Sequence, residues 1–473
     1  MSDPRYRSSF GFIDLLFNML IGFVFLFMLA FLLINPIAKK ETIKPKAEYF
    51  IELEWDGEKP FDLDIWVKDN MGHVVSFRRP DDALIHLERD DLGTVNDTYV
   101  DQNGKTVYLK ENREVVAIRT PANKDVTVSY EEDRQLVILA DKLNFTEAWM
   151  GEHYSSTAEP VTSPLIFHAS LISETRNIKF GTGVISLPQQ HPAVVAGQVS
   201  LLDHISKGRV ILGVGAGGLV SDWELFDNMN GRSRALTMIE SVEAIIKFWD
   251  DKDTYNYKGE FLDISLTKNI VSELGIGKFI KPFQKPYPEI AVSLKNPNSM
   301  TAKLAGQKGW IPISGNFVNA QDIATHWPTY KEAAQEIGKN PSYDKWRVGR
   351  SVLITSSDNE AKEILDDPMG VFTNYFLYLN SVSKLASGTP GNDINLQNEI
   401  PDAMQKAKDL IIVGSEQTVT EKLIHFIDTV GPFGTLLLTG HDVGEKKQLW
   451  ENSFSTMSNK IQPILNNYIK QKF

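Results

Sequence analysis

The sequence contains no cysteine. This absence excludes disulfides, thiolate zinc sites and cysteine nucleophiles, and we expect no metal site. An excess of positive charge is also absent, because 61 Asp and Glu outnumber 49 Lys and Arg and give a net charge of -12. The sequence has no basic stripe, so we expect no nucleic-acid partner. With 42% apolar and 23% charged residues, the composition is that of a globular protein and not of a disordered one.

Charge is missing altogether from residues 15–38, where only Asn18 and Asn35 are polar. About 20 apolar residues suffice for one helix across a bilayer. The run is too long for a secretory signal and ends in Asn35-Pro36, so residues 1–46 are predicted to hold a single-pass membrane anchor; a buried core helix is the alternative. Lysines after the span outnumber arginines before it, which predicts that the rest of the chain is cytoplasmic. These residues are Arg5, Arg7, Lys39, Lys40, Lys44 and Lys46.

Residues 47–113 show the two-residue alternation of half-buried strands. Tyr49, Ile51, Leu53 and Trp55 alternate with polar or outward positions, and a second alternating run covers residues 63–67. The pairs Asp56-Gly57 and Asn103-Gly104 are hairpin signals. These patterns predict a small all-β domain.

From about residue 130 helical stretches alternate with short apolar strands. We predict a helix at residues 131–143 and strands at 178–181, 210–214, 289–292 and 435–438. Eight such units close into a barrel of parallel strands. The sequence therefore predicts an α/β fold, a (β/α)8 TIM barrel, over residues 114–473.

A glycine-rich loop follows the predicted strand at 210–214. Gly213, Gly215 and Gly218 satisfy the G-x-G-x-x-G pattern of dinucleotide-binding folds. The motif lies deep inside the α/β region, however, and no strand ending in an acidic residue follows about 20 residues later. The alternative is a barrel strand whose glycines let a flat ligand approach the backbone.

Five blocks occur in order along the α/β region. They are AWMGEHY at 148–154, GTGVISLPQQHP at 181–192, LDHISKGRVILGVG at 202–215, KPFQKP at 281–286 and GPFGTL at 431–436. Together these blocks resemble the bacterial luciferase-like flavin monooxygenases, in particular the limonene and alkanal monooxygenase-like subgroup. The resemblance implies a TIM barrel with its site at the carboxyl ends of the strands.

The resemblance also implies roles for single residues. His153 matches the family's catalytic histidine, and Gly183-Val184 matches a non-prolyl cis peptide beneath the flavin ring. The second histidine of the family signature is Tyr154 here, which puts the substrate in doubt. Tyr154, Gln189 and His191 are expected on the substrate side, whereas Gly215, Ser299 and Thr301 are expected to hold the cofactor. An arginine that the family can carry at the position of Ala216 is absent.

The implied activity is a monooxygenase reaction that uses reduced FMN and O2 to oxygenate a small organic substrate. A separate flavin reductase supplies the reduced FMN, a deazaflavin coenzyme is the alternative cofactor, and a dimer is left open. The flavin carries the redox chemistry, while the protein positions and shields it.

The segment at 113–121 raises a conflict. It could serve as the first barrel strand, or it could end the preceding β domain, and a barrel without its first strand would expose unpaired edges. A second interpretation therefore stays open. In it, the chain is a membrane-anchored β-domain interaction protein, a gene fusion that carries an inactive or incomplete barrel.

Overall fold

The computed structural model describes residues 129–250, 255–441 and 446–473, apart from the side chain of Arg232. Before residue 129 it describes the course of the strands between residues 49 and 118 and the start of the first helix, without their side chains. The predicted span at 15–38 lies outside these residues. Within them, the helices are too short or too polar to cross a membrane.

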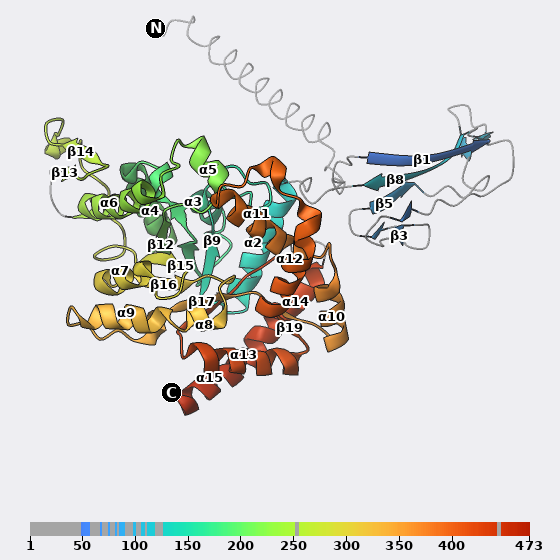
Figure 1. Ribbon diagram of the computed structural model, residues 1–473. Helices are drawn as coiled ribbons and strands as arrows, with labels where there is room; N and C mark the ends of the chain where they lie inside the picture. The colour runs from blue at the N-terminus through green and yellow to red at the C-terminus, as the bar shows by residue number, and fades with distance from the viewer. Residues whose placement is uncertain are drawn as a thin grey trace, which may run out of the picture. The chain divides into compact units, whose positions relative to one another are not determined.

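The first part of the described chain is built of antiparallel strands (Figure 1). One sheet has the order β1-β8-β5-β4, and β1 pairs with β8 from Tyr49↔Ile118 to Asp56↔Glu111. The strands that flank Asn103-Gly104, β6 and β7, pair antiparallel as the hairpin signal predicts. The bounds are β1 Tyr49–Asp56, β2 Val67–Lys68, β3 Val74–Val75, β4 Asp81–Asp82, β5 Ile85–Arg89, β6 Thr98–Val100, β7 Thr106–Tyr108 and β8 Glu111–Ile118.

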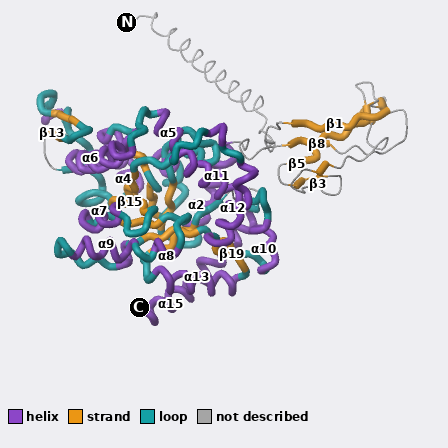
Figure 2. Tube along the Cα trace, in the orientation of Figure 1, coloured by secondary structure: helices purple, strands orange, loops and turns teal. Residues whose placement is uncertain are grey.

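Parallel strands with helices around them form the second part (Figure 2). Their order is β20-β17-β16-β15-β12-β10-β9, β11 pairs with β12, and β18 pairs with β19. The predicted strand at 435–438 is confirmed as β20, and the other three are confirmed to within one residue or two. The bounds are β9 Glu147–Met150, β10 Lys179–Thr182, β11 Ile185–Ser186, β12 Val210–Gly215, β15 Ile290–Leu294, β16 Ile311–Ser314, β17 Arg347–Arg350, β18 Val352–Ile354, β19 Ile412–Gly414 and β20 Thr435–Leu438.

The helices follow the strands in alternation, and a short hairpin of β13 (Tyr255–Lys258) and β14 (Asp263–Leu266) is inserted after α6. The helices before it are α2 Val126–Lys142, α3 Pro164–Ala169, α4 Pro192–Ser206, α5 Val220–Leu225 and α6 Gly231–Trp249. Those after it are α7 Met300–Lys308, α8 Ala320–Ile323, α9 His326–Gln335, α10 Asp358–Asp366, α11 Val371–Ala386, α12 Leu396–Leu410, α13 Glu416–Val430, α14 Lys447–Thr456 and α15 Gln462–Lys472.

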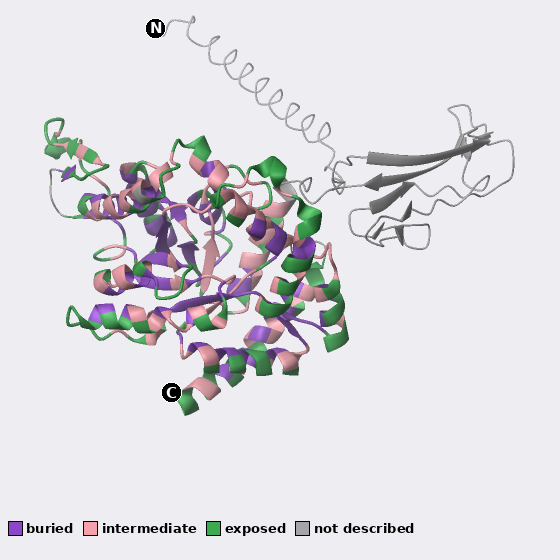
Figure 3. Ribbon diagram, in the orientation of Figure 1, coloured by how far each residue is buried: buried purple, intermediate pink, exposed green. Residues whose placement is uncertain are grey.

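The core lies between the strands and the inner faces of these helices. Figure 3 shows buried residues on the central strands and exposed residues on the outer helix faces. All six residues of β12 are buried, as expected for a parallel strand covered on both sides. Trp149 of β9 packs against the small interior cluster of Ile211, Ala291 and Ile311. The barrel interior is therefore filled by side chains.

The barrel differs from the predicted (β/α)8 ring at one place. The sheet ends at β9 and β20, and within the described residues no strand pairs these two edges with each other. Residues 114–118, which the sequence analysis assigned to the barrel, lie in β8 and pair with β1 and β5. In β8 the register with β1 takes up backbone hydrogen bonds that a first barrel strand would need, and the start of the barrel domain at residue 114 stays a prediction.

Candidate active site

The carboxyl ends of the parallel strands gather the polar residues that the sequence analysis singled out. In register, Met150 of β9 lies beside Thr182 of β10, so the chain segments after these strands leave the sheet together. His153 and Tyr154 follow β9, Gly183-Val184 follows β10, and the glycine loop begins at the end of β12. In TIM barrels this end of the strands carries the active site.

His153 lies between two carboxylates. Its Nε2 is 3.1 Å from Oε2 of Glu159, and its Nδ1 is 3.9 Å from Oδ2 of Asp222. The second distance is too long for a hydrogen bond. The Nδ1 atom is buried and has no hydrogen-bond partner among the described residues. A buried polar atom without a partner indicates a position that a ligand or a water molecule completes.

Asp222 of α5 fixes the backbone next to His153. Its carboxylate is almost fully buried and accepts hydrogen bonds from the backbone N–H groups of Tyr154 (3.1 Å) and Ser155 (2.8 Å). The Ser155 hydroxyl also donates to this carboxylate. These bonds hold the chain directly after β9. No residue was predicted from the sequence to have this role.

Glu152, which follows β9, carries a buried carboxyl group, and the residue is 3% exposed. It accepts hydrogen bonds from the backbone N–H of Ser186 (2.9 Å) and from Nε2 of Gln190 (2.6 Å). Burial raises the pKa of Glu152 to about 7, although both hydrogen bonds act in the opposite direction. Glu152 thus ties the end of β9 to β11 from inside the barrel.

Tyr154 lies next to this carboxyl. Its hydroxyl accepts a hydrogen bond from Nε2 of Gln190 at 3.2 Å, and its ring meets Phe226 edge to face, with centroids 4.9 Å apart. Burial raises the pKa of Tyr154 to about 12, so its hydroxyl is neutral at physiological pH. Its half-buried aromatic surface fits the expected substrate side.

The peptide bond between Gly183 and Val184 is cis, as the sequence analysis predicted. Its place beneath a flavin ring stays a prediction. The glycines of β12 have a packing reason of their own. A Cβ on Gly213 would lie 1.9 Å from the carbonyl oxygen of Thr182, and one on Gly215 would lie 2.6 Å from Cγ2 of Val184. The G-x-G spacing therefore reflects the close approach of β10 and β12 and not a dinucleotide site.

Beyond β12 the loop is lined by polar atoms that lack partners. A Cβ on Gly217 (φ +86°) would lie 3.2 Å from Nε1 of Trp223 and 3.3 Å from Nε2 of Gln189. Nε1 of Trp223 and Oε1 of Gln189 are buried and have no hydrogen-bond partner among the described residues. Arg234 stacks 3.5 Å above the Trp223 ring. Glycine backbone beside unpaired donors and acceptors fits a flat, polar-edged group such as an isoalloxazine ring.

Ser299 and Thr301, which are expected to hold the cofactor and would bind its phosphate, lie at the start of α7. Ser299 is the N-cap, and its hydroxyl accepts a hydrogen bond from the backbone N–H of Thr301 at 3.2 Å. Lys295, at the end of β15, places its Nζ 3.3 Å from the position of a Cβ on Gly218. Burial lowers the pKa of Lys295, against the effect of the Glu159 charge. Within the described residues this ammonium makes no hydrogen bond or ion pair, so it is available to an anion.

The substrate-side role expected of His191 stays a prediction, and the structure shows a capping role for this residue. It is the N-cap of α4, is exposed, and its Nδ1 accepts a hydrogen bond from the backbone N–H of Ala193 at 3.2 Å. No contact between described residues links it to His153 or Tyr154. Its proline neighbour Pro192 begins the helix, which explains why a capping side chain stands there.

A second polar cluster follows β16, β17 and β20. Nε2 of His441 lies 2.7 Å from the Ser351 hydroxyl, and Asn316 donates to the hydroxyl of Tyr375 at 2.9 Å. Burial lowers the pKa of His441 to about 4. Phe372 and Tyr375 pack edge-on against the His441 ring. This buried, neutral imidazole joins helix α11 to the strands.

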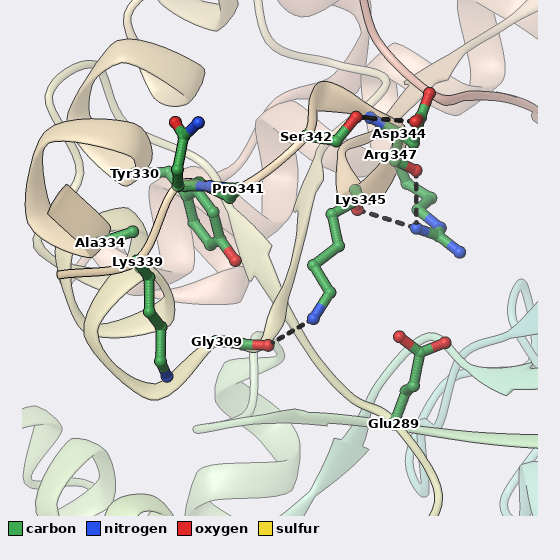
Figure 4. Close-up of a pocket in the computed structure, with 12 residues that line it drawn as sticks. Glu289, Gly309, Tyr330, Ala334, Lys339, Pro341, Ser342, Asp344, Lys345 and Arg347 are labelled. Carbon is green, nitrogen blue, oxygen red and sulfur yellow. Dashed lines mark hydrogen bonds between the residues drawn. The ribbon is translucent and has the colours of Figure 1, made fainter. Parts of the chain in front are cut away.

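A cavity of about 570 Å³ lies at the opposite end of the strands, lined by Glu289 before β15 and Arg347 at the start of β17 (Figure 4). The Lys345 ammonium there donates to the carbonyl oxygen of Gly309 at 2.9 Å. Neither His153 nor any other predicted site residue lines this cavity. Among the described residues, no group of three or more His, Asp or Glu side chains could hold a metal ion.

Comparison with known proteins agrees with this geometry. The family described as luciferase-like monooxygenase matches residues 114–431. The chain is 28% identical over 344 residues to 3,6-diketocamphane 1,6-monooxygenase from Pseudomonas putida, which covers 69% of this chain and 90% of that protein. It is 27% identical over 354 residues to limonene 1,2-monooxygenase from Rhodococcus erythropolis, covering 73% and 84%.

A solved structure is similar as well. It is the oxygenating constituent of 3,6-diketocamphane monooxygenase from Pseudomonas putida, described as a type II Baeyer-Villiger monooxygenase in complex with FMN. The TM-score is 0.61 at 25% identity, and the match covers 73% of this chain and 95% of that one. The chain belongs to the luciferase-like monooxygenase family, and its barrel is that of an FMN-dependent monooxygenase.

Proposed function

We propose that the chain is the oxygenating component of a two-component system that receives reduced FMN from a separate reductase and oxygenates a small organic substrate with O2. The observation that carries the proposal is the arrangement around His153. An imidazole with one unpartnered buried nitrogen stands at the same end of the strands as the glycine-lined ends of β10 and β12. A titratable group next to a flat binding surface is what flavin-dependent oxygenation needs from the protein.

When bound, FMN supplies the chemistry that activates oxygen and delivers one oxygen atom to the substrate. The residues of the chain have other tasks. Gly183-Val184 and Gly215 offer backbone to the flavin ring, while His153 holds or moves a proton at Nδ1. Tyr154 and Phe226 supply an aromatic wall on the substrate side. Glu152 and Asp222 hold these groups in place through the backbone bonds described above.

The proposal is tested by titrating the full-length chain, in detergent, with FMN and with a deazaflavin coenzyme. We expect saturable FMN binding, and ¹⁸O from labelled O2 in the product when a camphane diketone or limonene is supplied with reduced FMN. A chain that bound neither cofactor would favour the anchored interaction protein with an inactive barrel.

The FMN phosphate is expected at Lys295, Ser299 and Thr301. Lys295→Met should weaken FMN binding by about 10- to 150-fold, because a hydrogen bond to a charged partner contributes roughly 1.5–3 kcal/mol. Riboflavin, which lacks the phosphate, should bind the variant as well as the wild type. Flavin fluorescence titrations measure both affinities, and Lys331→Met, an exposed lysine of α9, is the matched control. An equal loss for FMN and riboflavin would contradict the assignment.

We also propose that residues 15–38 anchor the chain in a membrane with the barrel on the cytoplasmic side. The charge-free run and the lysines that follow it support this placement. Full-length protein should sediment with membranes, whereas a variant without residues 1–46 should stay in the supernatant. Full-length protein that is soluble and monodisperse without detergent would overturn the anchor.

A dimer is proposed through α4. Val194, Leu201 and Ile205 are more than half exposed, and with exposed Gln198 they repeat at intervals of four, three and four residues. This spacing is that of a helix–helix seam, and identical faces pair most simply about a two-fold axis. Light scattering should show a dimer that the pair Leu201→Asp and Ile205→Asp converts to a monomer. A monomeric wild-type chain would exclude this interface.

A further inference from the structure

Glu159 lies beside His153 but has no role in the function proposed above. It lies in the loop after β9, and its Oε2 is 3.1 Å from Nε2 of His153. The same oxygen accepts a hydrogen bond of 2.9 Å from the hydroxyl of Tyr378, which comes from α11. Two side chains of the loop after β9 therefore meet one from α11, with Glu159 between Tyr378 and the imidazole.

The partners of Asp222 show why Glu159 and not Asp222 sets the state of the ring. Asp222 is engaged by the backbone N–H groups of Tyr154 and Ser155 and by the Ser155 hydroxyl. Its nearest oxygen stays 3.9 Å from Nδ1 of His153, beyond hydrogen-bond reach. Glu159 is the carboxylate close enough to accept an N–H from the ring.

The neutral imidazole carries its proton on one nitrogen, and the hydrogen bond of that nitrogen selects the tautomer. Nε2 is the ring nitrogen within hydrogen-bond distance of Glu159. An Nε2–H donated to this carboxylate would leave Nδ1 as the basic atom. Nδ1 is also the ring atom that is buried without a partner among the described residues. Both observations indicate that Nδ1 of His153 is the atom that exchanges a proton with a bound molecule.

Tyr378 completes the arrangement by holding Glu159. Burial, followed by the charge of Glu159, raises the pKa of Tyr378 above its usual range, so its hydroxyl remains a donor. The charge of Glu159 also acts on Lys295, which follows β15. A carboxylate that accepts a hydrogen bond from an imidazole N–H is the arrangement that orients the catalytic histidine in Ser-His-Asp triads.

We infer that Glu159 is a positioning residue, which accepts Nε2–H of His153 and thereby fixes the tautomer that leaves Nδ1 free for the bound flavin or substrate. The inference rests on the proposed function in one respect, namely that His153 exchanges a proton during turnover. The tautomer of His153 is a structural property that can be measured without any enzymatic activity.

The test combines a spectroscopic and a kinetic measurement on the full-length chain. In protein labelled with ¹⁵N-histidine, the resonance missing from His153→Ala identifies His153. We expect it to show protonated Nε2 and bare Nδ1 in mildly alkaline buffer. Glu159→Gln, whose amide can either accept or donate, should give a tautomer mixture, and Glu159→Asp should restore the wild-type pattern. A Glu159→Gln spectrum identical to that of wild type would overturn the inference.

Turnover gives the second measurement. Glu159→Gln should lower kcat by about 10- to 100-fold, the range seen when a metal-bound histidine loses its hydrogen-bonded carboxylate or carbonyl partner. KM and FMN affinity should hardly change. In the His153→Ala background the same substitution should have no further effect, because Glu159 acts through the ring. A further loss there would mean that Glu159 acts independently of His153.

Controls separate the possible failures. Tyr378→Phe should lower kcat by less than Glu159→Gln, since the contact with Nε2 remains. Glu421→Gln, an exposed glutamate of α13 bonded only to Gln417, should leave both readouts unchanged. If the wild-type chain failed to bind FMN, the proposed function would fail, whereas the tautomer measurement on the protein alone would still decide the role of Glu159.

Discussion

Replacing His153 by alanine is expected to lower turnover by roughly 10²- to 10⁴-fold, the contribution of a positioned acid–base group. FMN affinity should change little, because ring and phosphate contacts come from other strands. Neighbouring strands lie about 4.8 Å apart, and β9 pairs directly with β10. The imidazole after β9 is therefore close to the backbone of Gly183-Val184 that is expected beneath the flavin.

Stopped-flow oxidation of the bound reduced flavin, with product analysis, measures this effect beside a binding titration. His425→Ala, an exposed histidine of α13, serves as the control. If His153→Ala abolished FMN binding while the oxidation rate of any residual complex stayed at the wild-type value, His153 would be structural.

Removing the buried acid Glu152 is expected to change how stability depends on pH. Its pKa is raised from 4.5 to about 7 in the folded protein, mainly by burial. A raised folded-state pKa means that the stabilising contribution is fully present below about 4.5 and is lost as the pH rises through 7. The shift corresponds to about 3 kcal/mol between these limits.

Urea unfolding of wild type and Glu152→Gln across this range measures the difference. Because the glutamine cannot ionise, the free energy of unfolding of the variant should rise relative to wild type, by up to about 3 kcal/mol, as the pH increases from 4.5 to above 7. Asp358→Asn is the control, since this exposed carboxylate lies on α10 and its pKa is lowered by bonds from Ser415 and Thr418. A constant difference between Glu152→Gln and wild type at all pH values would contradict the assignment.

Much of the fold could be predicted from local pattern. Apolar runs bounded by turn residues located β10, β12, β15 and β20, because buried parallel strands are apolar throughout. The segment at 113–121 could not be assigned in this way, since a strand of either sheet would show the same residues. Only its pairing with β1, over eight residues, decides for the antiparallel sheet.

Some residues of the candidate site could likewise be predicted from local sequence patterns, and others could not. The cis peptide at Gly183-Val184 stands in a short sequence signature and is confirmed, whereas the catalytic role expected of His153 stays a prediction. Asp222 and Tyr378 were missed, since their partners Tyr154 and Glu159 lie 68 and 219 residues away in the chain. No local pattern marks such residues, because their role comes from the packing of α5 and α11 over the strand ends. The helix-capping role of His191 was not predicted, although a histidine before proline suits a helix cap.

The open edge of the sheet at β9 affects His153, which follows this strand. This strand is paired on one side only, within the described residues, and all four of its residues are partly exposed, whereas β12 is buried throughout. Backbone amides of such an edge open more readily, so those of β9 should exchange with deuterium faster than those of β12. The buried ion pair between Glu147 of β9 and Arg347 of β17, with N and O 2.6 Å apart, holds the base of this strand. The order of His153 therefore depends on an open edge of the barrel, and local fraying of that edge would abolish activity before the protein unfolds.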